Sequence, residues 1–331
     1  MFKKSLNVFA CLFSLAILTL PIQAHAANKK VVLRLAHEMS ENHPYHAGAG
    51  KFGEFLSKKT NGEVTIQIYP NGTLGKQAQL VEAMSLGTVD LALTNTPVME
   101  RYVPELAVLG LPYVARSWEH IYKVVDGEIG AEFNKKFEAQ GITVLAYHET
   151  GSYNISSTMP IIKPEDIRGI KTRVPQGASS AELGKALGCN VTTLAFSEVY
   201  TALQLGTINA HFTAGMDNTY YSKFYEVCKY YIFLDIAYYL EPLSMSKMVY
   251  DRLSPEHQKA IKEAAMESAI WQRNFVRSET KTKEELMAKN YGLIVHHASD
   301  AEKAVWAKAT EDVYEKFPDW LPMVQRIKAV K

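Results

Sequence analysis

Strands and helices alternate regularly over the N-terminal part of this chain, and this order constrains the fold more than any single motif. The segments 31–36, 64–69 and 89–93 are short and rich in Val, Ile and Leu, which is typical of strands. The segments 45–59 and 76–86 between them have the apolar periodicity of helices. Successive strands joined by helices form a parallel sheet with right-handed crossovers. The sequence therefore predicts an α/β fold.

The segment 169–175 contains the first candidate binding residue. Alternating apolar and polar residues over 170–174 predict a strand, Pro175 ends it, and a helix follows over 176–187. Arg173 therefore lies at the carboxyl end of a strand, where open α/β sheets bind ligands. A guanidinium group can hold a carboxylate with two parallel hydrogen bonds. Our hypothesis is that Arg173 binds a small carboxylate; the alternative is a surface arginine paired with a nearby acid.

The N-terminus has the three parts of a secretory signal peptide. Lys3 and Lys4 precede a mostly apolar run over 6–20, which is short for a membrane span. Ala24-His25-Ala26 then fits a small-x-small cleavage site. We expect residues 1–26 to be cleaved and the mature protein to lie in the periplasm. The alternative is an uncleaved membrane anchor.

The mature chain, about 305 residues long, is nearly neutral and is long enough for two domains. Without Lys3 and Lys4, 34 Lys and Arg residues stand against 35 Asp and Glu residues. This balance argues against nucleic acid or anionic lipid as the main partner. The mature chain has two cysteines, Cys189 and Cys228, and the sequence favours two small buried thiols over a disulfide.

The order of elements predicts a two-lobed clamshell with a hinge cleft. The chain is expected to cross between lobes near 149–151 and again near 236–239. A helix that begins at Ser254-Pro255-Glu256 and runs past 286 is long enough to back both lobes, and a terminal helix is expected over 300–317. The predicted boundaries are 27–150 plus about 239–278 for lobe I, and 151–238 plus about 279–331 for lobe II.

Motifs of the common enzyme classes are missing from the sequence. It contains no Gly-x-Ser-x-Gly and no Gly-x-Gly-x-x-Gly, and the glycine-rich segment 48–52 lacks the spacing of a phosphate loop. His43 and His46 have metal-ligand spacing, but no third ligand accompanies them. We therefore expect a binding protein without a cofactor or a metal, and not an enzyme.

Several short motifs occur in a fixed order over nearly the whole mature chain. They are Pro-Asn-Gly-Thr-Leu-Gly at 70–75, Gly-Thr-Val-Asp at 87–90, Ile-Arg-Gly-Ile-Lys-Thr-Arg-Val-Pro at 167–175, Ala-Phe-Ser-Glu-Val-Tyr at 195–200 and Phe-Tyr-Glu-Val-Cys-Lys-Tyr at 224–230. This set closely resembles the DctP-type solute-binding proteins of tripartite ATP-independent periplasmic (TRAP) transporters. The resemblance implies a periplasmic-binding-protein fold that closes on an organic acid. It also implies delivery to the small and large subunits of a membrane permease driven by an ion gradient.

The resemblance also implies roles for particular residues. Arg173 matches the carboxylate-binding arginine, Phe196 the aromatic residue that covers the ligand, and Gln176 a polar contact beyond the arginine strand. Glu38 and Asn95 match cleft positions after the first and third strands. For each of these except Arg173, the alternative is an exposed loop residue.

Two departures from the family pattern bear on the ligand. Tyr153 stands where many members have a second arginine, and Thr213 where an asparagine usually helps to hold the carboxylate. One cation fewer argues against a C4-dicarboxylate, because buried charges are rarely left unpaired. We therefore expect a polar monocarboxylate, such as a sugar acid or a hydroxy acid. The second choice is an aromatic acid stacked on Phe196 and Phe212.

Other readings of the site remain open from the sequence. Glu38, or the adjacent His37, could meet an amine of the ligand instead of a hydroxyl. A periplasmic enzyme could use Glu38, His37 or His211 as acid–base groups on a clamped acid. A ligand-binding subunit of a membrane sensor would share the same site. The protein could be a monomer, or a homodimer through its long C-terminal helix.

Overall fold

The computed structural model describes residues 30–331, so the predicted signal peptide at 1–26 lies outside the described residues. β1 (Val31–Ala36) pairs in parallel with β2 (Val64–Tyr69) and with β3 (Leu91–Leu93). α1 (Pro44–Lys59) and α2 (Gln77–Ser85) connect these strands. The predicted α/β order with a parallel sheet is therefore confirmed. We call this half of the molecule the first lobe.

A second group of strands forms the lobe that contains Arg173. β5 (Lys171–Val174) lies between β6 (Asn190–Thr193) and β7 (Ala210–Ala214), and it runs parallel to both. β8 (Tyr230–Phe233) pairs in parallel with β10 (Ile294–His297). We call this half the second lobe.

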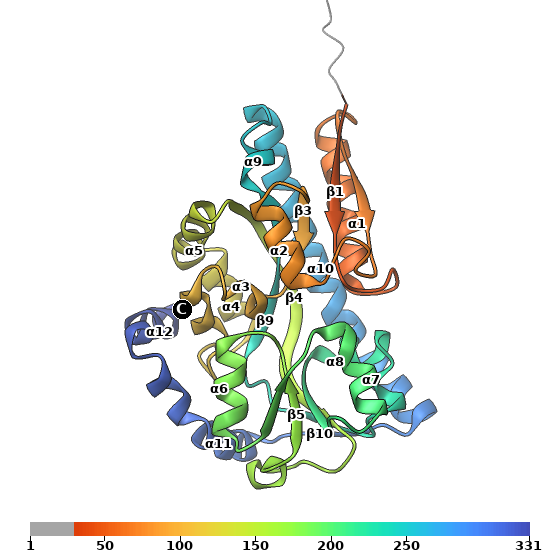
Figure 1. The fold of residues 1–331 in the computed structure, drawn as a ribbon, viewed down its shortest axis with the longest axis vertical. Helices are drawn as coiled ribbons and strands as arrows, with labels where there is room; N and C mark the ends of the chain where they lie inside the picture. The colour runs from red at the N-terminus through yellow and green to blue at the C-terminus, as the bar shows by residue number, and fades with distance from the viewer. Residues whose placement is uncertain (1–29) are drawn as a thin grey trace, which may run out of the picture.

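Two long strands join the lobes. β4 (Ile142–Ser157) and β9 (Tyr238–Ser246) pair antiparallel, with a register shift between Glu149 and Gly151. β9 also pairs with β3 of the first lobe, and β4 pairs with β7 and β8 of the second. Figure 1 shows both strands passing from the upper to the lower half of the molecule. The expected crossing near 149–151 thus lies within one continuous strand rather than in a loop.

The 37-residue helix α10 (Pro255–Tyr291) contacts both lobes. It packs on α1 in the first lobe and on α8 (Gly215–Tyr221) in the second, and it lies behind both in Figure 1. The Oγ of Ser254 accepts a hydrogen bond from the His257 amide at 3.2 Å, which caps the helix. The expected two-lobed α/β clamshell with a backing helix is therefore confirmed, whereas the exact lobe boundaries remain a prediction.

The remaining helices cover the two lobes and their loops. The α-helices are α3 (Thr96–Met99), α4 (Trp118–Val125), α5 (Glu128–Ala139), α6 (Ala178–Ala186), α7 (Val199–Gln204), α9 (Lys247–Tyr250), α11 (Asp300–Ala309) and α12 (Leu321–Ala329). The 3-10 helices are Pro104–Gly110, Pro164–Ile167, Phe196–Glu198, Phe224–Glu226, Glu311–Lys316 and Pro318–Trp320.

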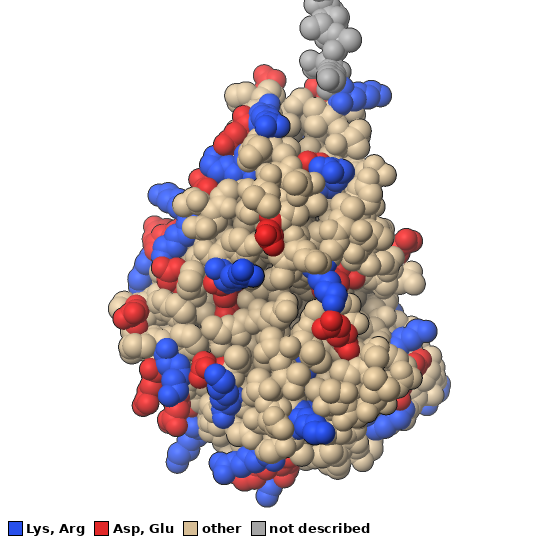
Figure 2. Space-filling view, in the orientation of Figure 1, with Lys and Arg blue, Asp and Glu red and all other residues tan. Residues whose placement is uncertain are grey.

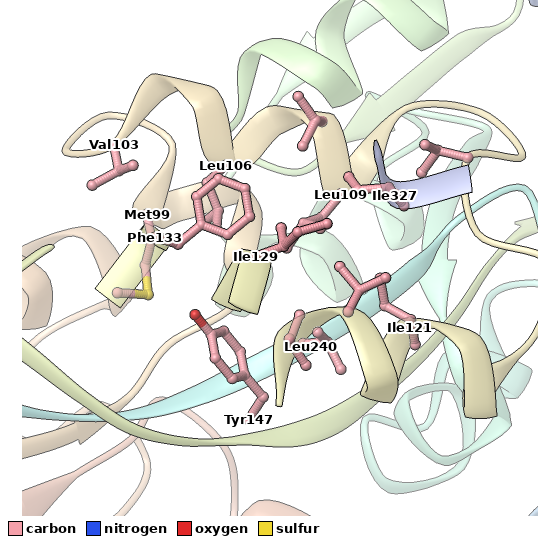
Figure 3. Close-up of a cluster of buried hydrophobic side chains, with 14 of the residues drawn as sticks. Met99, Val103, Leu106, Leu109, Ile121, Ile129, Phe133, Tyr147, Leu240 and Ile327 are labelled. Atoms are coloured by element: carbon pink, nitrogen blue, oxygen red, sulfur yellow. The ribbon is translucent and has the colours of Figure 1, made fainter. Parts of the chain in front are cut away.

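The largest apolar cluster fixes the joining strands to the helices of the first lobe. Figure 3 shows Tyr147 of β4 and Leu240 of β9 beside Phe133 and Ile129 of α5. Ile327 of α12 joins the same cluster. Burying aromatic and aliphatic side chains of this size stabilises a fold by about 1.5–3 kcal/mol each. The joining strands are thus held firmly on the first-lobe side of the cleft.

The predicted terminal helix over 300–317 is wrong in its length. α11 ends at Ala309, where the Oγ1 of Thr310 donates to the carbonyl of Trp306 at 3.0 Å. The backbone of Thr310 leaves the helical region (φ −116°, ψ 6°), and the 3-10 segment that follows it packs on α6 and buries Val313. The chain therefore turns through 3-10 helices before α12 begins.

The mixed charge of the surface and the free thiols agree with what the sequence composition predicts. Figure 2 shows positive and negative side chains interspersed on this face, with much of its centre uncharged. Among residues 30–331, none of the helices combines the length and apolarity that crossing a membrane requires. In the described part of the chain Cys228 is buried, Cys189 is half-buried and both are free, and burial raises the pKa of their thiols to about 12 and 11, respectively.

Candidate ligand-binding site

Arg173 lies in β5 and is buried between the lobes, with 4% of its surface exposed. Its Nε and Nη2 donate to the carbonyl oxygen of Leu194 at 3.1 and 2.9 Å. Within the described part of the chain, no carboxylate lies within ion-pair distance of this guanidinium. Burial lowers the pKa of Arg173 to about 10, which still leaves it charged at neutral pH. The site therefore contains a buried cation that no described acid pairs with directly, while the carboxylates of Glu38 and Glu198 act on it from a greater distance.

The bond to Leu194 determines which edge of the guanidinium is available. A guanidinium has five N–H donors, and the Leu194 carbonyl accepts from Nε and from one hydrogen of Nη2. The edge formed by Nη1 and the second hydrogen of Nη2 has no protein acceptor assigned to it. This edge has the fork geometry that binds both oxygens of a carboxylate. Leu194 thus orients Arg173 for an end-on bidentate contact.

A small pocket lies beside Arg173, between the two lobes. The first lobe contributes residues that follow β1 and β3 and one residue of α1, and the second contributes residues of β5 and β7 and residues that follow β5, β6 and β7. The joining strands β4 and β9 also contribute lining residues. The lining residues are Met39, Tyr45, Asn95, Thr150, Tyr153, Arg173, Pro175, Phe196, Phe212, Thr213, Ala214, Asn218 and Tyr239.

Two hydroxyl groups in this pocket are buried. Among the described residues the Thr213 Oγ1 has no hydrogen-bond partner, and the Tyr153 hydroxyl lies close to the hydroxyl groups of Ser180 and Tyr239. Tyr153 and Thr213 lie on adjacent strands, β4 and β7, whose register pairs Asn154 with Thr213. Because an unsatisfied buried hydroxyl costs free energy, these two groups are suited to bind polar atoms of a ligand.

Aromatic rings form the walls around these hydroxyl groups. Tyr153 stacks on Phe212 with ring centroids 5.0 Å apart. Tyr153 and Tyr239 are arranged edge to face, with ring centroids 4.5 Å apart. The Tyr239 hydroxyl is 3.0 Å from the Oγ of Ser180. The guanidinium carbon of Arg173 lies 6.0 Å from the Phe196 ring. One face of Phe212 is thus already covered, whereas Phe196 borders the arginine.

A buried histidine fixes the amide of Asn218 on the opposite side of the pocket. His43 Nδ1 accepts from the Tyr45 amide at 3.2 Å, so Nε2 carries the proton. Nε2 then donates to the Oδ1 of Asn218 at 3.0 Å. Burial lowers the pKa of His43 to about 3, which keeps it neutral. The Asn218 Nδ2 donates to the Ala214 carbonyl, so the orientation of this pocket amide is determined.

A buried acid supports two further lining residues. Glu241 is 1% exposed, and its Oε2 accepts from the Thr150 Oγ1 at 3.3 Å. Burial holds the pKa of Glu241 well above its usual range, and a hydrogen bond from Tyr45 acts in the opposite direction. Tyr45 and Thr150 thus present polar groups backed by a carboxyl group that burial favours in its neutral form.

The structure brings most of the predicted site residues together. Arg173, Phe196, Asn95, Tyr153, Thr213 and Phe212 all line the pocket. Glu38 and Gln176 line a second, smaller hollow that also includes Arg173, Asn95 and Phe196. Glu38 accepts a hydrogen bond from the Ser197 amide at 3.2 Å.

Two predicted residues do not line the pocket. His37 is fully buried beside it, and its Nε2 contacts the Nδ1 of His46 at 3.2 Å. His211 is also fully buried and packs on Phe224. Burial lowers the pKa of His37 to about 4 and that of His211 to about 3, so both are neutral at physiological pH.

Sequence reasoning missed several lining residues. Tyr45, Thr150 and Asn218 have no motif that distinguishes them, and Asn218 meets its partner His43 across 175 positions of sequence. Tyr239 carried the one usable signal, because it falls at a predicted crossing between lobes.

Comparison with known proteins identifies the family. The model for the bacterial extracellular solute-binding proteins of family 7, DctP, matches residues 35–319. The chain belongs to this family. The match covers most of the chain, including both lobes and the strands that join them.

Several similar proteins bind organic acids. The 2,3-diketo-L-gulonate-binding periplasmic protein YiaO of Escherichia coli is 30% identical over 75% of each chain. The TRAP solute-binding protein of Polaromonas sp. JS666, bound to D-erythronate, has a TM-score of 0.87 at 28% identity and covers 91% of this chain and 99% of that one. The Sulfitobacter sp. NAS-14.1 protein, bound to β-D-galacturonate, has a TM-score of 0.84 at 29% identity, over 90% and 98%.

Membership of the DctP family makes this chain a TRAP-type solute receptor of the periplasmic binding class, not an enzyme. Residues 30–331 contain no group of three or more His, Cys, Asp or Glu side chains arranged to hold a metal.

Proposed function

We propose that this DctP-family receptor captures a polar monocarboxylate of the sugar-acid or hydroxy-acid class. Arg173 binds the carboxylate through its Nη1–Nη2 edge, and Phe196 covers the ligand. Tyr153, Thr213, Asn95 and Asn218 bind hydroxyl groups. The observation that carries this proposal is the buried guanidinium of Arg173, whose protein partner is a neutral carbonyl.

Charge argues for one carboxylate. Tyr153, which carries no charge, borders the arginine end of the pocket, and Thr213 beside it is also neutral. A second carboxylate would therefore be buried without a cation, which costs several kcal/mol in a site closed to water. The sugar acids named for the structural relatives each carry one carboxylate and several hydroxyl groups, which supports the same class here.

Delivery to a TRAP membrane permease, and export to the periplasm by cleavage after residue 26, form part of the same proposal. Family membership supports the permease as the partner. The glutamate Glu38 lies in the smaller hollow next to Arg173 and accepts from Ser197. This contact supports a role for Glu38 in closing the cleft rather than in binding an amine.

A thermal-shift and calorimetric screen tests the ligand. D-erythronate, D-galacturonate, 2,3-diketo-L-gulonate and succinate are offered to the mature protein. We expect at least one monocarboxylate to bind at one site per chain, and a ligand at a hundred times its Kd should stabilise the protein by about 2.7 kcal/mol. Succinate is expected to bind at least tenfold more weakly.

Two arginine variants make the screen specific. Arg173→Ala should reduce affinity by roughly a hundredfold or more, because it removes a buried charge-assisted contact. Arg168→Ala, on the exposed turn before β5, is the matched control and should bind as the wild type does. If Arg173→Ala retained full affinity, the assignment of the carboxylate site would be lost.

A further inference from the structure

A buried acid of the first lobe bonds to the start of a helix in the second lobe. Glu100 follows α3 and is 6% exposed. Its Oε2 accepts from the Ser179 amide at 3.1 Å, and its Oε1 accepts from the Ser179 hydroxyl at 2.5 Å. Burial raises the pKa of Glu100 to about 7, which reflects how completely the closed lobes remove this carboxyl group from water.

The helix that receives this contact lacks a cap of its own. The N-cap position of α6 is Gly177, which has no side chain to accept from the first amides. The first amides of a helix have no acceptor within the helix. The Glu100 carboxyl group, from the opposite lobe, supplies that acceptor.

Gly177 is also required for the lobes to approach this closely. A Cβ atom at Gly177 would lie 2.8 Å from both the Cβ and the carbonyl oxygen of Pro97, and 3.0 Å from the Oε2 of Glu100. The φ of Gly177 is −167°, an extended value that any residue can adopt. A side chain here would therefore clash only when the lobes are closed, with no backbone strain within the second lobe itself.

The contact lies close to the proposed ligand site along the chain. Gly177 follows Arg173 by four residues, so the same short segment carries the carboxylate-binding arginine and the start of α6. Further contacts join the lobes, among them Lys76 to Glu198 at 2.7 Å, the Ser197 amide to Glu38 at 3.2 Å, and His43 to Asn218 at 3.0 Å. Lys76, Glu198 and Ser197 are exposed, whereas His43 and Asn218 are buried, as Glu100 and Ser179 are.

We infer that Glu100, capping α6 across the cleft with Gly177 as its close-approach partner, is a positioning residue that holds the receptor closed on its ligand. This inference rests on the proposed function for its ligand, but the contact itself does not involve the ligand. Glu100 makes this contact only while the two lobes are closed. It therefore determines how long a captured acid stays bound.

The test compares Glu100→Ala and Gly177→Ala with matched controls. Glu182→Ala removes a half-buried acid of α6 that pairs with Lys185, and Gly50→Ala adds a Cβ where no atom lies within 4 Å. With D-erythronate or D-galacturonate as the probe, both test variants should lose about ten- to a hundredfold in affinity, mainly through faster release. The controls should bind as the wild type does, and Glu100→Gln, which retains an acceptor oxygen, should recover most of the loss.

Hydrogen exchange provides a readout that needs no ligand identity. The Ser179 amide has no acceptor within its helix, so its protection reports the Glu100 contact directly. We expect faster exchange at Ser179 in Glu100→Ala than in the wild type, with the rest of α6 unchanged. Wild-type affinity together with unchanged exchange at Ser179 in Glu100→Ala would overturn the inference.

The two proposals can fail separately. If Arg173→Ala binds the acid normally, the carboxylate site is wrong, and the comparison of Glu100→Ala with Glu182→Ala still decides the closure contact. If no acid of the panel binds the wild type, the proposed ligand class is wrong. Hydrogen exchange at the Ser179 amide then decides whether the Glu100 contact forms. If Arg173→Ala loses binding while Glu100→Ala does not, only the closure contact is refuted.

Discussion

Tyr153 stacks on Phe212 with ring centroids 5.0 Å apart, and this pair occupies the part of the pocket next to Arg173. Both rings are fully buried, and the Tyr153 hydroxyl lies close to the hydroxyl groups of Ser180 and Tyr239. Resemblance to the family implies a second arginine at this position in many members. A ring and a hydroxyl group in its place leave the pocket with one cation, and they offer that hydroxyl to a polar ligand.

Replacing Tyr153 with Phe tests whether its hydroxyl serves the ligand. The stacking on Phe212 is retained, so the free energy of unfolding should change by less than about 1 kcal/mol. Affinity for the bound acid should fall by about three- to thirtyfold, because one hydrogen bond is lost in a dry site. Calorimetric titration with D-galacturonate and a denaturant melt measure the two quantities. Weaker stability at unchanged affinity would show that the hydroxyl is structural.

Arg273 should be important for stability rather than for binding. It is buried in α10, donates from Nε and Nη2 to the carbonyl of Tyr147 in β4 at 2.9 and 2.6 Å, and pairs with Asp126 at 2.6 Å. Arg273→Ala leaves these acceptors unpaired, and we expect it to lower the free energy of unfolding by about 3–5 kcal/mol. Urea denaturation measures this. Lys281→Ala, on an exposed turn of the same helix, is the control and should change it by less than about 0.5 kcal/mol.

The contribution of Asp217 to the free energy of unfolding should fall as the pH rises from about 4 to 7. Burial raises the pKa of Asp217 to about 7, the carboxylates of Glu149 and Glu279 raise it further, and Lys283 lowers it. A folded-state pKa above the unfolded value means that stability is fully present below the unfolded pKa and is lost as the pH rises through the folded pKa.

Asp217→Asn isolates this effect. Both carboxylate oxygens of Asp217 are buried without a partner, so the amide removes the cost of burying a charge. The variant should gain on the order of 1–3 kcal/mol over the wild type at pH 8 and little at pH 4. Urea melts across this pH range measure the slope. An equal change at both pH values would mean that Asp217 does not titrate in this window.

Export should remove the first 26 residues. The basic start, the apolar run and Ala24-His25-Ala26 predict that the mature protein begins at Ala27. Mass spectrometry of the protein from a periplasmic extract gives this end point directly. A full-length mass, recovered with the membrane fraction, would favour the anchor instead.

The sequence alone determined the order of the elements and the place of the arginine. The strands of the first lobe, the start of α10 at Ser254 and the position of Arg173 at the end of β5 all follow from local periodicity and turn residues. Such signals come from neighbours a few positions apart, so a single sequence contains them. The prediction of the terminal helix was wrong because the 3-10 segment after Thr310 packs on α6, a tertiary contact that the local helical pattern does not contain.

Only the tertiary structure decided what surrounds Arg173. The Leu194 carbonyl that orients the guanidinium lies 21 positions away, Asn218 meets His43 across 175 positions, and Glu100 meets Ser179 across 79 positions. None of these partners has a local pattern that marks it, because each pair is brought together by the packing of whole lobes. The chain thus carries its carboxylate-binding candidate in its local sequence, whereas the pocket that makes this arginine selective exists only in the closed fold.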